Sequence, residues 1–466
     1  MDKRIGSIRE AIRACGLKNG MTVSFHHHLR NGDYVMNMVM GVIAEMGIHD
    51  IRVCASSVYD CHAPMIDLMR RGVITGLETS YMSSSLGAAV TEGVLKNPVI
   101  FRSHGGRPAA ILSGETHIDV AFIAASAADS MGNCSGREGP TAFGALGYPV
   151  ADAMCADKVV VITDHLEPYP LNHFSISEQY VDYVVTVEQI GDSNGIIAGI
   201  TRLTRDPIAL EIAKMSVRVI ESSGLLRDGF SFQTGGGGAT LAVAKYLRES
   251  MLERNVRGSF AMGGVTKYLV EMLHDGCFKS LLDVQCFDLD AVRSLKEDPT
   301  HQEISAIHYA CPAARSAAVN SLDVATLGAT QIDTDFNVNV NTTSDGYIMG
   351  GSGGHSDCAA GAKMTVILMP LVRRRLPMVV DRVACITTPG RTVDVLVTQC
   401  GIAVNPARQD LYRRFVDAGL PVFDIQELKR MAYSITGIPD IKPAAGRVIA
   451  DVQYRDGQII DQIRQR

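Results

Sequence analysis

A repeat within the chain constrains its fold more than any other feature of the sequence. The segment DVAFIAASAADSMGN at 119–133 aligns with DVATLGATQIDTDFN at 323–337, with matching Asp, Val and Ala residues at the start and matching Asp and Asn residues further on. A second pair follows at nearly the same spacing, VDYVVT at 181–186 and VDVLVT at 393–398. Chance likeness between apolar strands is one explanation. The shared Asp and Asn are not core positions, however, and they favour a duplicated domain.

Short apolar runs rich in β-branched residues alternate with segments of helical period in both halves of the chain. KVVVIT at 158–163 and LLDVQCF at 281–287 are typical of buried strands, whereas 207–224 has the period of an amphipathic helix. Apolar strands alternating with helices indicate parallel sheets that are covered on both faces. We therefore predict the α/β class, with two tandem, duplicated open α/β domains of mainly parallel sheet at 1–224 and 225–466.

Charge, hydropathy and cysteine spacing exclude several classes of protein. A net charge of −6 without an extended basic tract argues against nucleic-acid binding. The most apolar stretches, such as MTVILMPLV, are about half as long as a membrane span. The eleven cysteines are irregularly spaced with no C-x-x-C pair, which argues against a metal site and fits reduced thiols. We predict a cytoplasmic protein that binds no metal, and we interpret the basic run Arg373–Arg375 as a solvated helix end or a docking site for an acidic partner.

Two glycine-rich loops in the second half are candidate binding elements. Gly235–Gly238 precedes a helical segment, where free backbone N–H groups attract anions and glycines allow close approach. No Lys-Ser/Thr follows, so this is not a nucleotide-binding P-loop, and a flexible turn is the alternative. In GGSGGHSD at 350–357, the glycines can present N–H groups to an oxyanion. His355, Ser356 and Asp357 are neighbours in sequence and cannot form a triad, and His355 is either a structural or a substrate-binding residue.

Polar residues also follow predicted strands in the first half. His26 and His28 would share one face of a strand, as donors to a substrate carboxylate or, less favoured, as metal ligands. Ser103 and His104 follow another strand, and ligands of α/β sheets bind at the carboxyl ends of strands. This histidine-rich set, with few paired carboxylates, suits an anionic substrate such as a polycarboxylate.

Several long motifs together resemble one known family. They are MTVSFHHHLRNGDYVMNMVM, SHGGRPAAILSGETHIDVAF, QTGGGGATLAVAKYL, LLDVQCFD, IDTDFNVNVNTTSDG, GGSGGHSDCAAGAK and VTQCGIAVNPAR. In this order, over nearly the whole chain, they resemble the citrate lyase alpha subunits, which are citrate:acetyl-acyl-carrier-protein transferases. The resemblance implies two tandem α/β domains of the CoA-transferase type, in agreement with the repeat.

The resemblance also implies a reaction and partners. Citrate displaces acetate from an acetyl thioester on the acyl-carrier gamma subunit, and the beta subunit then cleaves the citryl thioester. The thiol belongs to a phosphoribosyl-dephospho-CoA group on the gamma subunit, with acetyl-CoA as another donor, so this chain itself is expected to bind no cofactor. A hetero-oligomeric complex that works in citrate fermentation is expected.

One position departs from the pattern of the related enzymes. Related CoA-transferases carry a nucleophilic Glu at the end of the strand that here reads LGATQID, where this chain has Gln331. An amide cannot form the covalent acyl intermediate that a carboxylate forms. We interpret Gln331 as a hydrogen-bond donor in a direct route, in which the substrate carboxylate attacks the bound thioester. A weakly active or non-catalytic copy is the alternative.

With the resemblance, the candidate residues take predicted roles, because thioester exchange needs proximity and oxyanion stabilisation more than acid–base help. The predicted catalytic residues are Gln331, Gly351, Gly353 and Gly354. The predicted substrate-binding residues are His26, His28, Ser103, His104 and His355. The predicted CoA- or pantetheine-binding residues are Gly235, Gly236, Gly237, Gly238, Gly263 and Gly264.

Other functions remain open at this point. Within the class, a citramalate lyase alpha subunit or another dicarboxylate CoA-transferase has the same features. From a different class, the chain could be a non-catalytic scaffold of the lyase complex, an interpretation that only Gln331 favours. A phosphosugar isomerase is disfavoured, because the chain is duplicated and shows no lysine or carboxylate base pair.

Overall fold

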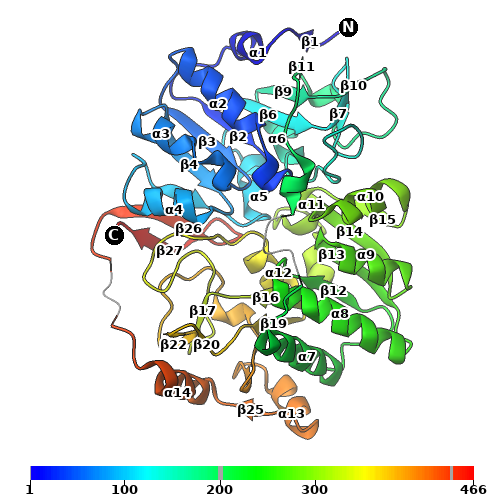
Figure 1. Ribbon diagram of the computed structural model, residues 1–466, viewed down its shortest axis with the longest axis vertical. Coiled ribbons are helices and arrows are strands. Elements are labelled where there is room, and N and C mark those ends of the chain that lie inside the picture. The colour runs from blue at the N-terminus through cyan, green and yellow to red at the C-terminus, as the bar shows by residue number, and fades with distance from the viewer. Residues whose placement is uncertain (1, 198–202, 441–443) are drawn as a thin grey trace.

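The frame of the molecule consists of two large sheets, one in each half (Figure 1). The computed structural model describes residues 2–197, 203–440 and 444–466. Helices lie between most of the successive strands, and the strands of both sheets are mainly parallel. The predicted α/β class is therefore confirmed. Among the described residues, no helix has both the length and the apolar character needed to cross a membrane.

The first sheet has ten strands and is parallel except for one antiparallel pair at its edge. Every residue of its central strands β2 and β6 is buried, because helices and loops cover both faces. In order across the sheet the strands are β1 (Arg4–Ile5), β11 (Tyr183–Thr186), β9 (Lys158–Thr163), β6 (Val120–Ala125), β2 (Thr22–Phe25), β3 (Ile51–Ala55), β4 (Ile74–Thr79), β5 (Val99–Phe101), β26 (Val448–Gln453) and β27 (Ile459–Arg464).

The second sheet has nine strands, with one antiparallel pair, β23 with β24. In order across the sheet the strands are β15 (His301–Glu303), β14 (Phe278–Cys286), β13 (Gly258–Val265), β12 (Ser231–Thr234), β16 (Val324–Gly328), β19 (Met364–Leu368), β23 (Val395–Thr398), β24 (Gly401–Val404) and β25 (Val422–Phe423).

Seven strands of one sheet have counterparts in the other, in the same spatial order. The order β11-β9-β6-β2-β3-β4-β5 matches β23-β19-β16-β12-β13-β14-β15. The register agrees as well, because Val120 pairs with Val23 and the repeat-related Val324 pairs with Phe232. The duplication that the repeat predicts is therefore present in the topology.

The Asp and Asn shared by the two repeats hold the same turn in each half. The Asp129 carboxylate accepts hydrogen bonds from the backbone N of Asn133 at 3.2 Å and from its side-chain amide at 2.8 Å. Asp333 accepts the corresponding two bonds from Asn337 at 2.9 and 3.2 Å. These positions recur because the Asp carboxylate accepts hydrogen bonds from backbone amides of the turn. Without it, those buried amides would have no hydrogen-bond partner.

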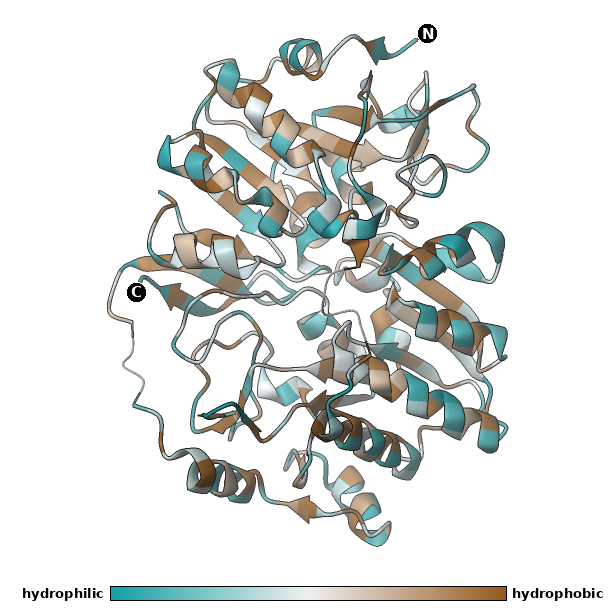
Figure 2. Cartoon of the chain, viewed as in Figure 1, coloured by the Kyte–Doolittle hydropathy of each residue, from teal (hydrophilic) through white to brown (hydrophobic). Residues whose placement is uncertain are grey.

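Helices cover the sheets with one apolar face each. In Figure 2 helices such as α8 and α9 carry both hydrophilic and hydrophobic segments, as expected of amphipathic helices on a sheet. In α9, for example, Leu269, Val270, Met272 and Leu273 are buried. The helices are α1 (Ile8–Ala14), α2 (Val35–Glu45), α3 (Met65–Arg70), α4 (Ser84–Thr91), α5 (Gly106–Ser113), α6 (Val150–Cys155), α7 (Pro207–Ser222), α8 (Gly238–Glu253), α9 (Lys267–His274), α10 (Leu289–Glu297), α11 (Ala306–Ala310), α12 (His355–Gly361), α13 (Gln409–Asp417) and α14 (Ile425–Thr436).

The C-terminal strands do not stay with the half from which they come. β26 and β27 form a hairpin at Asp456-Gly457, and β26 pairs in parallel with β5 of the first sheet (Figure 1). The predicted second unit of 225–466 is therefore too long at its C-terminal end, because its last two strands belong to the first sheet. The reason is that β5 would otherwise be an exposed edge, with unpaired backbone groups.

Small sheets extend the loops at the carboxyl ends of the strands. One contains β10 (Leu166–Glu167), β7 (Ala127–Asp129) and β8 (Cys134–Ser135), and its counterpart contains β18 (Val338–Asn339), β17 (Gln331–Asp333) and β22 (Val379–Val380). A two-stranded hairpin of β20 (Val372–Arg373) and β21 (Leu376–Pro377) carries the basic run Arg373–Arg375. The prediction of a helix end there is wrong, because Arg374 has a φ of 57°, the left-handed conformation of a tight turn.

Candidate active site between the two sheets

A cavity of about 340 Å³ lies where loops from both halves meet. The loops follow the carboxyl ends of equivalent strands, which is where ligands of α/β sheets bind. From the first half its lining residues include His27, Arg30, Ser57, Tyr59, Tyr81, His104 and Tyr148, and from the second half Gln233, Gly235–Gly237, Gly264, Gln285, Phe287, Tyr309 and Gly351–His355. No Asp, Glu or Lys is among the described residues that line this interdomain cleft.

The loops that follow β2 and β12 both contribute residues to the lining of the cleft. His26–His28 follow β2, and Gly235–Gly237 follow β12, the equivalent strand in the other half. The Gly235 amide is already used, since it donates to the Thr326 carbonyl at 3.0 Å. The amides of Gly236 and Gly237 have no partner among the described residues and lie at the N-terminus of α8, which favours an anion.

The glycine-rich loop at 350–354 crosses from the second half to pack against the first. Gly353 donates its amide to the Ser80 carbonyl at 3.0 Å, and its own carbonyl accepts from the His104 amide at 2.7 Å. A Cβ atom on Gly351 would lie 2.2 Å from the Ser80 carbonyl oxygen. Glycine is therefore needed here for backbone contact between the halves as well as for binding.

This packing corrects one part of the predicted oxyanion site. The Gly353 amide is engaged by Ser80, so it is not free to donate to a ligand. The amides of Gly351 and Gly354 make no hydrogen bond within the described part of the chain, and both residues line the cleft. Two of the three predicted donors are thus placed where an oxyanion could accept from them.

The predicted pair His26 and His28 lies beneath the cleft, whereas His27 lines it. The strand ends at Phe25, so the alternation on which the prediction rests does not continue through the three histidines. His26 Nε2 donates to the Ala124 carbonyl at 2.9 Å, and its Nδ1 lies 2.8 Å from His28 Nδ1. The side chains of His26 and His28 are therefore hydrogen-bonded to each other. His27 Nδ1 lies 2.7 Å from Ser56 Oγ.

Ser103 and His104 have different surroundings although they are neighbours. The Ser103 hydroxyl donates to Asp357 at 2.9 Å, so it ties the two halves together and does not line the cleft. His104 does line the cleft, and its buried Nδ1 has no partner among the described residues. Its ring lies 4.5 Å from Tyr148 and 5.6 Å from His27, centre to centre.

His355 is fixed by two hydrogen bonds. Its Nε2 lies 3.0 Å from the Gly328 carbonyl and must donate to it, so Nδ1, 2.8 Å from Thr388 Oγ1, accepts. Both ring nitrogens are therefore occupied, although the residue lines the cleft. This arrangement favours the structural interpretation of His355.

Burial keeps the histidines of this region neutral. It lowers the pKa of His26 and of His355 to about 4 and that of His104 to about 3. The pKa values of His27 and His28 are also well below 6.5, first because of burial and then because of neighbouring histidines. At neutral pH each of these rings can donate one hydrogen bond and accept one but carries no charge.

We expect these neutral histidines to make the protein less stable at acid pH. Below about pH 6.5 the unfolded chain takes up protons on these rings while the folded chain does not, so the free energy of unfolding falls by up to about 1.4 kcal/mol per pH unit for each histidine. The pKa of Asp357 is raised to about 6 by burial, which opposes part of this loss.

Urea unfolding at pH 7.5 and pH 5.5 measures the effect. The wild-type midpoint should be lower at pH 5.5, and the His104→Gln variant should show a smaller decrease. Equal wild-type midpoints at the two pH values would contradict the expectation.

Gln331 lies outside the interdomain cleft. It is buried, its amide donates to the Pro377 carbonyl at 3.2 Å, and it lines a separate cavity of about 540 Å³ together with Tyr433 and Asp461. Its strand, β17, belongs to a small sheet whose counterpart β7 carries Ala127 at the matching position. The structure therefore does not bring Gln331 together with the glycine loops.

Gly238, Gly263 and Gly264 also have distinct places. Gly238 starts α8 and lines a neighbouring cavity of about 510 Å³. Gly263 has a φ of 109° at a β-bulge, and a Cβ atom there would lie 3.0 Å from the Gln233 amide. Gly264 lines the interdomain cleft, where a Cβ atom would lie 2.2 Å from the Phe287 ring.

Several cleft residues are absent from the prediction made from the sequence. Gln285 and Phe287 follow β14 and could have been found by the strand-end rule. Tyr309 comes from α11, and its hydroxyl lies 3.0 Å from Gln233 Nε2 and 3.1 Å from Cys358 Sγ, contacts that depend on the tertiary fold alone. The cleft residues absent from the prediction include His27, Arg30, Tyr59, Tyr81, Tyr148, Gln233, Gln285, Phe287 and Tyr309.

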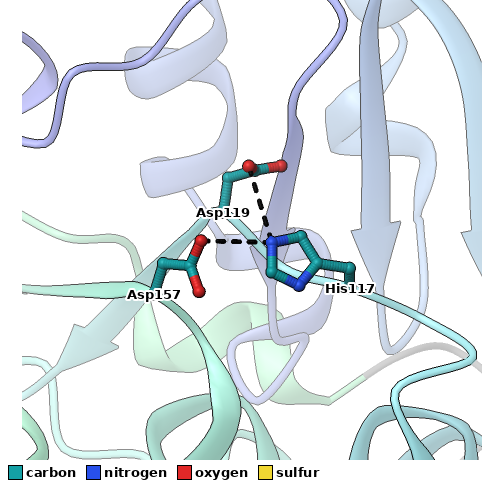
Figure 3. A group of neighbouring side chains, drawn as sticks. All are labelled: His117, Asp119 and Asp157. Carbon is teal, nitrogen blue, oxygen red and sulfur yellow. Dashed lines mark hydrogen bonds and ion pairs between the residues drawn. The ribbon is translucent and has the colours of Figure 1, made fainter.

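One group of side chains in the described parts of the chain has the composition of a metal site. His117 Nε2 lies 3.1 Å from Asp157 and 3.7 Å from Asp119 (Figure 3). These residues precede β6 and β9, at the end of the first sheet opposite the cleft. In the other half the equivalent carboxylate, Asp323, pairs with Lys363 at 2.7 Å.

Comparison with known proteins shows what the chain resembles. Residues 2–466 match the family model described as "Citrate lyase, alpha subunit (CitF)". The chain is 48% identical over 459 residues to the citrate lyase alpha chain of Klebsiella pneumoniae, covering 98% of this chain and 90% of that relative.

Solved structures agree with this match. The chain superposes with a TM-score of 0.98 and 48% identity on a Streptococcus mutans structure described as the alpha subunit of citrate lyase in complex with citrate, covering 100% of this chain and 91% of that one. A Pseudomonas malonate decarboxylase hetero-tetramer in complex with malonate shares the fold, with a TM-score of 0.70, 17% identity and coverage of 94% and 85%.

Proposed function

The chain belongs to the citrate lyase alpha-subunit family, and we propose that its interdomain cleft is where the citrate CoA-transferase reaction of that family takes place. The reaction moves a thiol from an acetyl thioester to citrate and releases acetate. Subunits of this family work in a hetero-oligomeric complex. We propose that the acyl-carrier gamma subunit delivers the thioester and that the beta subunit receives the citryl thioester.

The observation that carries this proposal is the convergence of two kinds of binding element on one cavity. One side offers Arg30 and the uncharged polar side chains of Ser57, Tyr59 and His104, and the other offers the free backbone amides of the glycine loops. A polycarboxylate and a thioester need these two environments, held next to each other so that the exchange becomes effectively intramolecular.

The chemistry requires two displacements. A citrate carboxylate oxygen attacks the thioester carbonyl carbon, and the C–S bond breaks to release the thiolate and leave a mixed anhydride. The thiolate then attacks the citryl carbonyl carbon of that anhydride, and the C–O bond breaks to release acetate. No net proton transfer occurs, which suits a cleft whose histidines are neutral and which no described Asp, Glu or Lys lines.

Each displacement passes through a tetrahedral oxyanion. The free amides of Gly351 and Gly354 are suited to donate to it, and loss of one such donor typically lowers the rate by about 10²–10³-fold. The amides of Gly236 and Gly237 at the start of α8 are a second donor pair on the same cavity.

The neighbouring cavity is suited to the arm of the thioester. It shares Gly237, Thr240 and Gly328 with the interdomain cleft, and its lining includes Arg373 and Arg374 on the β20–β21 hairpin. We propose that the pantetheine arm passes through it, with the two arginines near the phosphates of the carrier group or of CoA.

An acyl-exchange assay tests the proposed function. The purified chain with acetyl-CoA and citrate should form citryl-CoA, detected by mass spectrometry. Preference for citramalate would identify a citramalate lyase subunit instead. No exchange with either acid, despite native folding and binding of the other subunits, would support a scaffold.

We expect Gln331→Glu not to increase the rate of this exchange, because the side chain does not reach the interdomain cleft. An ionised Glu in this buried position cannot donate the hydrogen bond that the Gln331 amide gives to the Pro377 carbonyl. The free energy of unfolding should therefore fall by about 1–3 kcal/mol. Citryl-CoA formation and urea unfolding measure the two effects. Gln426→Glu, at an exposed position in the first turn of α14 where the side chain forms no hydrogen bond with a described residue, is the control. A large gain in rate for Gln331→Glu would contradict this placement.

A further inference from the structure

Among the described residues, Arg30 is the one buried arginine that lacks a carboxylate partner. Three arginines of the described chain, Arg30, Arg102 and Arg107, are each only 4% exposed. Arg102 pairs with Glu78 at 3.1 Å, and Arg107 pairs with Asp152 through two hydrogen bonds. Arg30 forms no ion pair with any described residue, although burial of an unpaired charge costs several kcal/mol.

The contacts that Arg30 does make leave its guanidinium only partly satisfied. Its Nη1 donates to the Ile196 carbonyl at a long 3.3 Å, and its buried Nε has no partner. The Tyr59 hydroxyl is its other polar neighbour. The guanidinium lies over the Phe287 ring, 3.8 Å from the ring centre, which fixes its plane but does not neutralise its charge.

The backbone around Arg30 is built to hold this position. Arg30 has a φ of 51°, a left-handed conformation that costs a non-glycine residue about 1–2 kcal/mol. The turn is held by Gly32, where a Cβ atom would lie 1.9 Å from the Asp192 carbonyl oxygen. Such strain persists where the surrounding structure enforces it, and it is typical of functional sites.

The second half of the molecule supports the same side chain. Phe287 lies under the guanidinium, and the ring has room only because residue 264 is glycine. Gly264 therefore acts on the arginine through Phe287, and it need not touch a ligand directly. Arg30 is held between the halves, at the wall of the interdomain cleft.

Among the described residues that line the cleft, Arg30 carries the one permanent charge. The histidines that line the cleft, His27, His104 and His355, are kept neutral by burial. No described carboxylate in the cleft competes for the guanidinium of Arg30. A planar guanidinium with free donors matches the geometry of a carboxylate, which it can bind through two parallel hydrogen bonds.

We propose that Arg30 binds a carboxylate of the acyl acceptor and is the residue that selects a polycarboxylate in this cleft. One carboxylate pairs with Arg30 while another is left to attack the thioester. This inference rests on the proposed function, since it assigns the acceptor to that cleft. His104, with its free Nδ1, and Ser57 lie on the same wall and are suited to bind the remaining polar groups of citrate.

The test compares Arg30→Gln with Arg107→Gln by citrate titration and thermal unfolding of the full chain. For Arg30→Gln the Kd for citrate should rise about 10²-fold. Its melting temperature without citrate should be unchanged or higher, because a buried unpaired charge is gone. For Arg107→Gln the melting temperature should fall, because Asp152 loses its partner.

Kinetics give a second measurement. In Arg30→Gln the KM for citrate should rise with the Kd while the KM for acetyl-CoA changes by less than about threefold. Arg30→Lys keeps the charge but not the two parallel donors and should recover part of the affinity. Unchanged citrate affinity in Arg30→Gln would overturn the inference and leave the proposed function intact. A wild-type chain that binds citrate through Arg30 but exchanges no acyl group would support the inference and contradict the proposed function.

Discussion

Replacing Gly354 with alanine should lower the rate of citryl-CoA formation by about 10²–10³-fold. The added Cβ atom would lie 2.2 Å from the Tyr309 hydroxyl oxygen, far inside van der Waals contact. Tyr309 cannot move aside easily, because it is buried and its hydroxyl is bonded to Gln233 and Cys358. The backbone at Gly354 must shift instead, and the free amide proposed to receive the oxyanion moves with it.

Two further variants make this prediction specific. Gly41 lies in α2 outside both cavities, has an ordinary φ and has no atom within 4 Å of a built Cβ, so Gly41→Ala should keep the rate within about twofold. In Gly354→Ala/Tyr309→Phe the hydroxyl is absent and part of the rate should return. Equal losses in Gly354→Ala and Gly41→Ala would show that the position of the Gly354 amide is not important.

Replacing Asp357 with alanine should have the largest effect on stability. Its buried carboxylate accepts from the Ser103 hydroxyl at 2.9 Å and from the Gly105 amide at 2.8 Å, and it lies 3.5 Å from Arg455 Nε. Ser103 and Gly105 belong to the first half and Asp357 to the second, so this one side chain joins them. Its loss leaves the partly buried Arg455 without its carboxylate and leaves two buried donors unpaired, and we expect the free energy of unfolding to fall by about 3–5 kcal/mol.

The same change should affect catalysis through His104, which lies between the two donors in sequence. Displacement of that loop by about 1 Å can lower kcat/KM by about 10²-fold. Urea unfolding and the exchange assay measure the two effects. Asp357→Asn keeps an acceptor oxygen and should lose less, and Asp417→Ala, at an exposed site on α13, should change stability by at most about 0.5 kcal/mol. A fully stable and active Asp357→Ala protein would contradict this role.

The fold was largely predictable because its signals are local and repeated. Apolar strands such as 158–163 and amphipathic helices such as 207–224 have periods that can be read directly, and both are present. The Asp and Asn of the repeat could be recognised because the same turn requires them twice. The exchange of β26 and β27 to the first sheet could not be predicted, because a strand gives no sign of which edge it will pair with.

The candidate site was predictable in its loops and less so in its side chains. The strand-end rule found the His26–His28 and Gly235–Gly238 loops, both of which reach the cleft. It failed to choose His27 over its neighbours, because the strand stops at Phe25 and alternation no longer applies. Gln331 was placed in the site through its likeness to a catalytic Glu, but the small sheet that contains β17 directs it to a different cavity.

The sequence by itself determined the α/β class, the duplication and the family. These depend on periodicity and on motifs that can be recognised without knowledge of their contacts in the folded chain. The tertiary structure alone decided which residues face the cleft. The glycines of 350–354 proved to be contacts between the halves as well as cavity wall, because a backbone can approach Ser80 so closely only without a side chain. Arg30, buried and unpaired, could not be distinguished from any other arginine in the chain, because the lack of a partner is a property of its surroundings and not of its sequence.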